Sequence, residues 1–280
     1  MSIKIIIDST VDVREDLLQR FIVVPLTVSF GSEQFIDGIT INHKKFYEKL
    51  VESDIMPTTS QPAPQAFADV FEEITANGDQ AVVLTISTKL SGTYQSAKIA
   101  ADGYEGKVWV VDTKSVAIGS GILAELALKL VDEGFCAKEI VEILTTEREN
   151  VRVIALLDTL EYLKKGGRIS KTAAFAGGIL SIKPVLSVLG GELALLGKAR
   201  GSKQGNNYLT SEIKKSGGVN FDKPILLGYT GLSDALLKKY TEDSEELWQS
   251  YTDHLNCAVI GSVVGTHAGP NAIAAAFFCK

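Results

Sequence analysis

The sequence predicts an α/β protein of two domains: a three-layer α/β/α domain with a mainly parallel sheet over residues 1–150, and a smaller α+β domain with a mixed sheet over residues 151–280. In the first half, apolar strands alternate with helices, and "QAVVLTIS" and "KVWVVDT" are continuous apolar runs typical of a parallel sheet that is buried on both faces. In the second half, "KPVLSVLGGELALLGKARG" predicts two strands joined by a hairpin at Gly190–Gly191. Because no low-complexity linker separates the halves, we expect a close interface between the domains.

The expected elements of the first half follow one another closely. The run "IKIIID" predicts a strand, "REDLLQRF" a helix and "IVVPLTVSF" an extended segment. Asn42 is suited to cap the next helix, "HKKFYEKLVESD". The helix "PQAFADVFEEITANG" places Phe67, Phe71 and Ile74 on one face and ends before Gly78. Further helices are expected after "LSGT" and over "GILAELALKLVDEG".

The second half mixes strands and helices in a less regular order. "VRVIALLDT" predicts a strand, and the predicted hairpin is followed by a helix near "GNNYLTSEIKKSGG". A strand is then expected over "KPILLGYTG" and an acidic helix over "SDALLKKYTEDSEELWQSY". We expect "AVIGSVVGTHAGP" to close the chain as a last strand.

Composition excludes several classes of function. The net charge is −6 with a pI near 5.3, and no long basic run favours nucleic acid or an anionic membrane surface. The N-terminal run is interrupted at Asp8, too early for a signal peptide, and no uninterrupted apolar run could span a bilayer. The three cysteines are far apart and favour reduced thiols, so we expect a cytoplasmic protein without a metal site, a cofactor or an integral membrane segment.

Three hydroxyl- or glycine-rich turns are candidate ligand sites. "SGT" follows a predicted parallel strand and starts a helix, so Ser91 and Gly92 can cap that helix or contact an anion. "TTSQPAP" holds Thr59 and Ser60, and "GTHAGP" holds His267 between glycines. Taken alone, each turn is better explained as a local structural feature. A nucleophile elbow would need Gly-x-Ser-x-Gly, and the stretch before Ser91 lacks its first glycine.

Two short basic loops stand out in this acidic chain. "KKGGRIS" contains Arg168 and "GKARGSK" contains Arg200. Either loop could bind a phosphate or a partner, and a solvated turn is an equally good interpretation. Neither is a phosphate-binding Gly-x4-Gly-Lys-Ser/Thr loop, and no Gly-x-Gly-x-x-Gly dinucleotide motif is present.

Taken in order, these motifs resemble the bacterial DegV family. The matching stretches are "DST", "TSQP", "LSGTYQSA", "DT-x-S", "LEYLKKGGRIS", "IKPVL" and "GTHAGP", and they span essentially the whole chain. The resemblance implies two α/β domains with a long-chain fatty acid buried between them. It further implies the lipid-binding subunit of a fatty acid kinase, which presents the fatty acid carboxylate to a separate ATP-binding kinase subunit that makes acyl phosphate.

The resemblance also implies roles for individual residues. Thr59, Ser91 and His267 would surround the carboxylate, together with the neighbouring Ser60 and Gly92, and no residue of this chain would be catalytic. Arg168 and Arg200 would lie near the pocket mouth and contact the phosphate or the kinase. One departure is Asn271, where the family commonly has glycine; we expect no change of ligand class from it.

Two alternatives remain open from the residues themselves. The basic loops would suit a self-contained small-molecule phosphotransferase, although the missing phosphate loop argues against it. A hydrolase that uses Ser91 and His267 would release acid from an ester and react with a serine-directed phosphonate.

Overall fold

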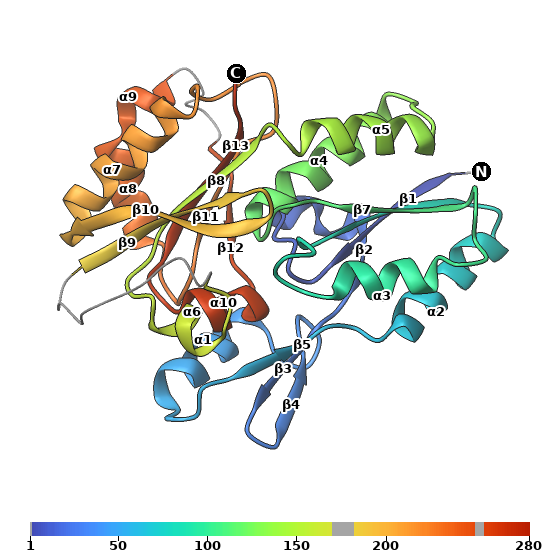
Figure 1. Ribbon diagram of the computed structural model, residues 1–280, viewed down its shortest axis with the longest axis horizontal. Helices are drawn as coiled ribbons and strands as arrows, with labels where there is room; N and C mark the ends of the chain where they lie inside the picture. The colour runs from blue at the N-terminus through green and yellow to red at the C-terminus, as the bar shows by residue number, and fades with distance from the viewer. Residues whose placement is uncertain (1, 170–181, 250–254) are drawn as a thin grey trace.

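The computed structural model describes residues 2–169, 182–249 and 255–280. Its strands form three sheets (Figure 1). A four-stranded parallel sheet takes all its strands from the first 112 residues, and a six-stranded mixed sheet takes all of its strands from residue 151 onward. A small three-stranded antiparallel sheet lies in the first half of the chain. This is the predicted two-domain α/β architecture, and we keep residue 150 as the proposed boundary.

The parallel sheet is covered by helices on both faces, as predicted. Its order is β2-β1-β6-β7, with bounds β1 (Ile3–Asp8), β2 (Phe21–Val24), β6 (Gln80–Thr85) and β7 (Val108–Asp112). Ile6 and Val83 point to the face that packs on α2 (Pro64–Ala76) and α3 (Thr93–Ala100). Ile5 and Leu84 point to the other face, which packs on α4 (Ile118–Asp132) and α5 (Ala137–Glu147). The predicted helix after β1 is a 3-10 helix, η1 (Glu15–Arg20).

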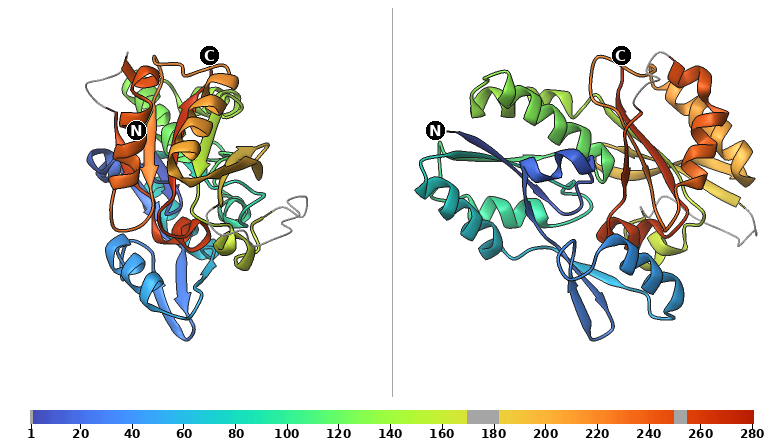
Figure 2. Two further views of the ribbon diagram at one scale, coloured as in Figure 1. Left: turned by 90° about the vertical axis from the view of Figure 1, so that its left-hand side faces the viewer. Right: turned by 180° about the vertical axis from the view of Figure 1, so that it is seen from behind.

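The small sheet was not predicted. "IVVPLTVSF" is extended, but it divides into β2 and β3 (Thr27–Phe30), and β3 pairs antiparallel with β4 (Glu33–Ile36) and β5 (Thr58–Ser60). The helix α1 (His43–Glu52) follows, and Asn42 caps it as expected by accepting from the Lys45 N–H at 2.9 Å. The views in Figure 2 show this unit projecting from one end of the molecule. Its importance for the site is that β5 carries Thr59.

The mixed sheet contains the predicted hairpin. Its order is β10-β9-β8-β13-β11-β12, with bounds β8 (Val151–Leu156), β9 (Ile182–Leu189), β10 (Glu192–Arg200), β11 (Leu226–Tyr229), β12 (Cys257–Val259) and β13 (Ile273–Phe278). Strands β9 and β10 pair antiparallel, with Leu189 opposite Glu192 across the turn. One face packs on α7 (Gly201–Lys215), α8 (Ala235–Asp243) and α9 (Glu245–Trp248). The last part of the expected acidic helix, residues 250–251, lies outside the described residues.

The end of the chain differs from the sequence prediction. We expected "AVIGSVVGTHAGP" to be the closing strand, but only its first part belongs to β12; α10 (Ser262–Ala268) follows, and β13 is the last strand. Two tertiary contacts end the strand here. The Gly261 N–H donates to Asp12 Oδ1 at 2.8 Å, and the Tyr47 hydroxyl donates to the Ile260 carbonyl at 3.0 Å. These contacts redirect the backbone just before α10, against the strand preference of its valines.

Helix α4 joins the two large sheets into one core. It packs on β1 and β6 of the parallel sheet and on β8, β11 and β13 of the mixed sheet (Figure 1). Ile5 and Ala276, one from each sheet, belong to the same buried apolar cluster. The expected close interface between the two halves is therefore present. The described residues contain no helix that combines the length and apolar character needed to cross a bilayer.

Candidate functional site

A cavity of about 370 Å³ lies between the two large sheets. On one side, Thr10 and Ile86 line it where they follow the carboxyl ends of the neighbouring strands β1 and β6. The chain leaves β1 toward β2 on one side of the sheet and leaves β6 toward β7 on the other, so the strand order reverses at this point. Ligands of open α/β sheets commonly bind at such a reversal, and the volume is in the range of small-molecule pockets.

One end of the cavity is polar and combines the three candidate turns. Thr59 and Ser60 reach it from β5, Ser91 and Gly92 from the turn before α3, and His267 from α10. Thr59 Oγ1 lies 3.1 Å from His267 Nε2, although the two residues are 208 positions apart in the chain. The structure thus brings together all five residues that the sequence predicted to contact the ligand.

Ser91 is not the N-cap of α3. The helix begins at Thr93 and its N-cap is Gly92, so Ser91 lies one residue earlier than a capping residue would. Its hydroxyl still accepts from the Thr93 N–H at 3.3 Å and lies 2.9 Å from Thr93 Oγ1. The side chain therefore stabilises the turn locally and also lines the cavity.

Gly92 allows the end of the Gln61 side chain to lie directly against the turn. A Cβ atom at this position would lie 2.2 Å from Gln61 Oε1, while the Gln61 amide donates to Ser96 Oγ at 3.0 Å. Gln61 therefore holds the turn against α3 and lines the cavity itself. We did not single out Gln61 from the sequence, although it lies within the quoted "TTSQPAP" stretch.

Replacing Gly92 with alanine should destabilise the turn by about 1 kcal/mol, because the new methyl group displaces the Gln61 amide and breaks its hydrogen bond to Ser96. Urea unfolding of wild type, Gly92→Ala, Gln61→Ala and the double variant would measure this. We expect the double variant to be less destabilised than the sum of the single changes, since shortening Gln61 removes the overlap. Strict additivity would contradict this explanation.

His267 is neutral at physiological pH. Burial, with a smaller contribution from the positive charge of Arg168, lowers the pKa of its imidazole to about 4. Nδ1 is buried without a hydrogen-bond partner among the described residues. An unpaired acceptor is tolerated better than an unpaired N–H donor, so the tautomer with its proton on Nε2 is favoured. In that tautomer Nε2 donates to Thr59, whose own hydroxyl proton can then point to a ligand oxygen.

The two predicted arginines occupy different places. Arg168 lines the cavity, is largely exposed, and donates to the carbonyls of Gly166 at 2.8 Å and Leu90 at 3.4 Å. It therefore connects the loop after α6 (Glu161–Lys165) to the turn that carries Ser91. Arg200 is exposed at the end of β10 and is not part of the cavity lining. The expected position at the pocket mouth is thus observed for Arg168 alone.

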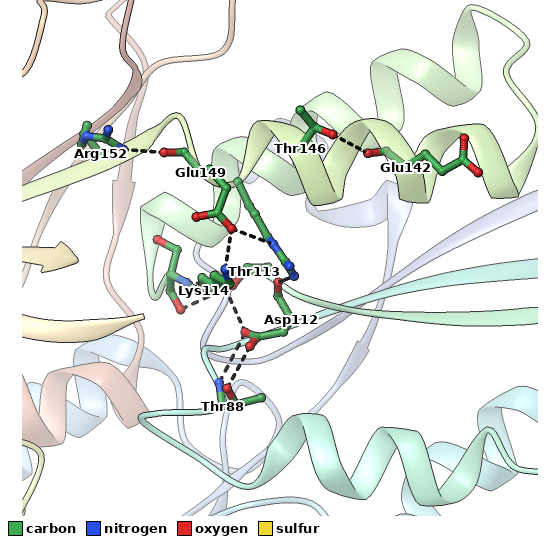
Figure 3. A network of polar contacts seen from close by, with 10 residues as sticks. Thr88, Asp112, Thr113, Lys114, Glu142, Thr146, Glu149 and Arg152 are labelled. Carbon is green, nitrogen blue, oxygen red and sulfur yellow. Dashed lines mark hydrogen bonds and ion pairs between the residues drawn. The ribbon is translucent and has the colours of Figure 1, made fainter. Parts of the chain in front are cut away.

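Polar contacts fix the base of the Ser91 turn. Asp112, at the end of β7, accepts from the Thr88 hydroxyl at 2.8 Å and the Lys114 N–H at 2.9 Å (Figure 3). The Arg148 guanidinium donates to the Asp112 carbonyl at 2.7 Å. The Ser87 hydroxyl donates to the Gly191 carbonyl at 2.7 Å, which connects the turn to the β9–β10 hairpin. The loops after β6 and β7 are thereby held in place beside the cavity.

The rest of the cavity is mainly apolar. Side chains of β8, β9 and β13, the start of α4 and α10 form its walls, and they include Val153, Ala155, Leu157, Leu186, Val188, Ala272, Ala274, Ile118 and Val263. Sequence analysis did not assign these residues, since they come from many segments and look like ordinary core positions. A mainly apolar cavity with a cluster of polar side chains suits an amphipathic ligand.

The geometry does not favour the hydrolase alternative. His267 Nε2 pairs with Thr59, and the Ser91 hydroxyl pairs with Thr93, so the hydrogen bonds of both side chains differ from those of a nucleophile and its base. Within residues 2–169, 182–249 and 255–280, no group of three or more His, Cys, Asp or Glu side chains could hold a metal ion.

Comparison with known proteins gives a consistent result. The sequence model of the DegV family matches residues 2–280. A DegV domain-containing protein of Caldanaerobacter subterraneus is 34% identical over 99% of this chain and 98% of its own length, and one of Clostridium acetobutylicum is 35% identical over 99% of each.

Solved structures agree in fold over the full length. A DegV family protein of Thermus thermophilus, described as binding fatty acid, has a TM-score of 0.86 and 31% identity, covering 99% of this chain and 100% of that chain. A stearic-acid-binding protein of Eubacterium ventriosum has a TM-score of 0.88 and 27% identity, covering 99% and 98%. The family match over nearly every residue, together with these likenesses, shows that the chain belongs to the DegV family.

Proposed function

We propose that this protein binds a long-chain fatty acid in the cavity and presents the carboxylate to a separate ATP-binding kinase subunit. The observation that carries the proposal is the distribution of polarity in the cavity: Thr59, Ser91 and His267 meet at one end, and the walls beyond them are mainly apolar. The fatty-acid-binding structures that share this fold, one of them described as a DegV family protein, support this ligand class.

Burial of the tail supplies the gross driving force for binding. About fifteen methylenes at ~0.8 kcal/mol each give ~12 kcal/mol, from which the ordering of tail and protein must be subtracted. Burying the carboxylate without hydrogen bonds would cost too much free energy, so the hydroxyls of Thr59 and Ser91 serve as donors to it, and the neutral His267 orients the Thr59 hydroxyl by donating to its oxygen. Because none of these donors is charged, the carboxylate oxygen stays more nucleophilic than it would under a bidentate arginine.

The phosphoryl transfer itself belongs to the partner in this proposal. The chain carries no phosphate-binding loop, so ATP would be bound by the kinase subunit. Arg168 at the exposed edge of the cavity would meet the transferring phosphoryl group, and Arg200, which is exposed and does not line the cavity, is better suited to contact the partner. We propose the cytoplasm as the location because all three cysteines are free thiols.

Purified protein should contain fatty acid, because a buried apolar tail dissociates slowly. Organic extraction followed by mass spectrometry would identify it. After delipidation, added palmitate or oleate should raise the melting temperature as its concentration increases, since a ligand that binds the folded state alone stabilises it. Decanol and a serine-directed phosphonate are suitable controls for the carboxylate and for hydrolase chemistry. No extracted fatty acid together with an unchanged melting temperature would refute the proposal.

A further inference from the structure

The apolar floor of the cavity is formed by alternate residues of two paired strands. Ala155 of β8 lies opposite Ala274 of β13, and both line the cavity. Leu157 and Ala272 lie toward the polar end, where the chain continues into α6 and comes from α10. Val153 lines the cavity two residues further along β8, away from the polar end.

The start of α4 closes the cavity beside Val153. A Cβ atom on Gly119 would lie 2.2 Å from Val153 Cγ2, so the helix backbone rests directly on this valine. The neighbouring Ile118 lines the cavity. On β13 the floor ends at the same level, because Ala276, the strand partner of Val153, is fully buried and does not line the cavity. The next pair on this face of the two strands, Val151 and Phe278, is buried and does not line the cavity either.

The floor has the length of a long acyl tail. Leu157 directly follows β8 and lies four residues from Val153, which corresponds to ~14 Å of extended chain. An extended chain advances about 1.2 Å per bond, because three backbone bonds span ~3.5 Å. About eleven or twelve carbons therefore fit along the floor beyond the carbons that lie at the polar end.

We propose that Val153, backed by Gly119, is the stop that sets the longest acyl chain this protein accepts. The inference rests on the proposed fatty-acid function and adds its chain-length determinant. The methyl groups of Val153 meet the end of the tail, and Gly119 prevents the valine from moving away, because the helix backbone fills the space behind it. The three small residues Ala155, Ala272 and Ala274 leave the path to this stop open.

Two substitutions, one that shortens the side chain at position 153 and one that lengthens it, test this role. Val153→Ala removes two carbons from the stop, so the affinity for a saturated acid two carbons longer than the wild-type optimum should rise about tenfold relative to the optimum. Val153→Ile adds one carbon and should shift the preference to shorter acids. The measurement is competition binding on delipidated protein with even-numbered saturated acids from twelve to twenty-two carbons.

Ile154→Val is the matched control. Ile154 lies next to Val153 on the same strand, is equally buried, and belongs to the cluster on the opposite face of the sheet. Its loss of one methylene should lower stability without changing the chain-length profile. A general loss of stability in Val153→Ala could not by itself produce opposite shifts of the chain-length profile. The inference requires Val153→Ile to shift that profile toward shorter acids.

Each outcome decides the inference. Opposite shifts in the two Val153 variants, with an unchanged profile in Ile154→Val, support it. Normal wild-type binding with the same profile in both Val153 variants would overturn this inference alone. Wild-type protein that binds no acid of any length would overturn the proposed function and the inference with it.

Discussion

Replacing Arg168 with alanine is expected to slow acyl-phosphate formation by about 10–1000-fold while fatty-acid affinity stays close to the wild-type value. The guanidinium lies at the exposed edge of the cavity, and among the described residues it donates to the carbonyls of Gly166 and Leu90. The hydroxyls of Thr59 and Ser91, which donate to the carboxylate in this proposal, make no hydrogen bond to Arg168 and would stay in place. A charge that meets only the transferring phosphoryl group stabilises the transition state and not the bound fatty acid, so its loss lowers the rate selectively.

The measurement pairs a fatty-acid titration with a reconstituted assay that contains the kinase subunit and ATP. Arg168→Lys should recover part of the rate, since it restores a charge without the planar guanidinium. Arg20→Ala removes an exposed arginine of η1, remote from the cavity lining, and should leave the rate unchanged. A wild-type transfer rate in Arg168→Ala would exclude a role in transfer, and a parallel loss of fatty-acid affinity would reassign Arg168 to ligand binding.

Arg200 offers a further contrast within the same assay. Because it is exposed and away from the cavity, a loss of rate in Arg200→Ala should diminish as the kinase concentration is raised. A defect of Arg168→Ala should persist at saturating kinase.

The regular part of the fold could be predicted from local patterns. Continuous apolar runs gave β6 and β7, and the adjacent glycines at 190–191 gave the β9–β10 hairpin, because these signals lie within single segments. The α10 helix and the small antiparallel sheet could not be predicted in this way. The backbone before α10 depends on Asp12 and Tyr47, which are more than 200 residues away in the chain.

In the site, too, residues in recognisable local motifs could be predicted, and residues whose roles depend on tertiary packing could not. The hydroxyls and the histidine were identified because their motifs resemble a known family, and the structure places them together at the polar end. Gln61 and the apolar walls were missed, since their roles depend on packing between distant segments. Asn271 illustrates a departure with a simple explanation: its φ of 63° lies in the left-handed region, which asparagine adopts more readily than most residues other than glycine.

Delipidated wild-type protein is expected to lose about 2–3 kcal/mol of unfolding free energy from His267 alone as the pH falls from 7 to 4. Burial, with a smaller effect of Arg168, lowers the pKa of this imidazole to about 4 in the folded protein, against an ordinary value of 6.5. Between these two values the unfolded chain binds a proton that the folded protein does not. The contribution of His267 is therefore complete above pH 6.5 and is lost as the pH approaches 4.

Comparison with His267→Gln isolates this effect. The buried carboxyls of Asp8, Asp12 and Asp37 have raised pKa values, chiefly because of burial, and their contribution to stability has the opposite pH dependence. They are present in both proteins, so they cancel in the difference between the two stability curves. Urea unfolding at pH 7, 6, 5 and 4.5 should show a wild-type advantage that shrinks as the pH falls. Parallel stability curves for the two proteins would mean that His267 is solvated and ionises normally. The assignment of a neutral imidazole that donates to Thr59 would then be wrong.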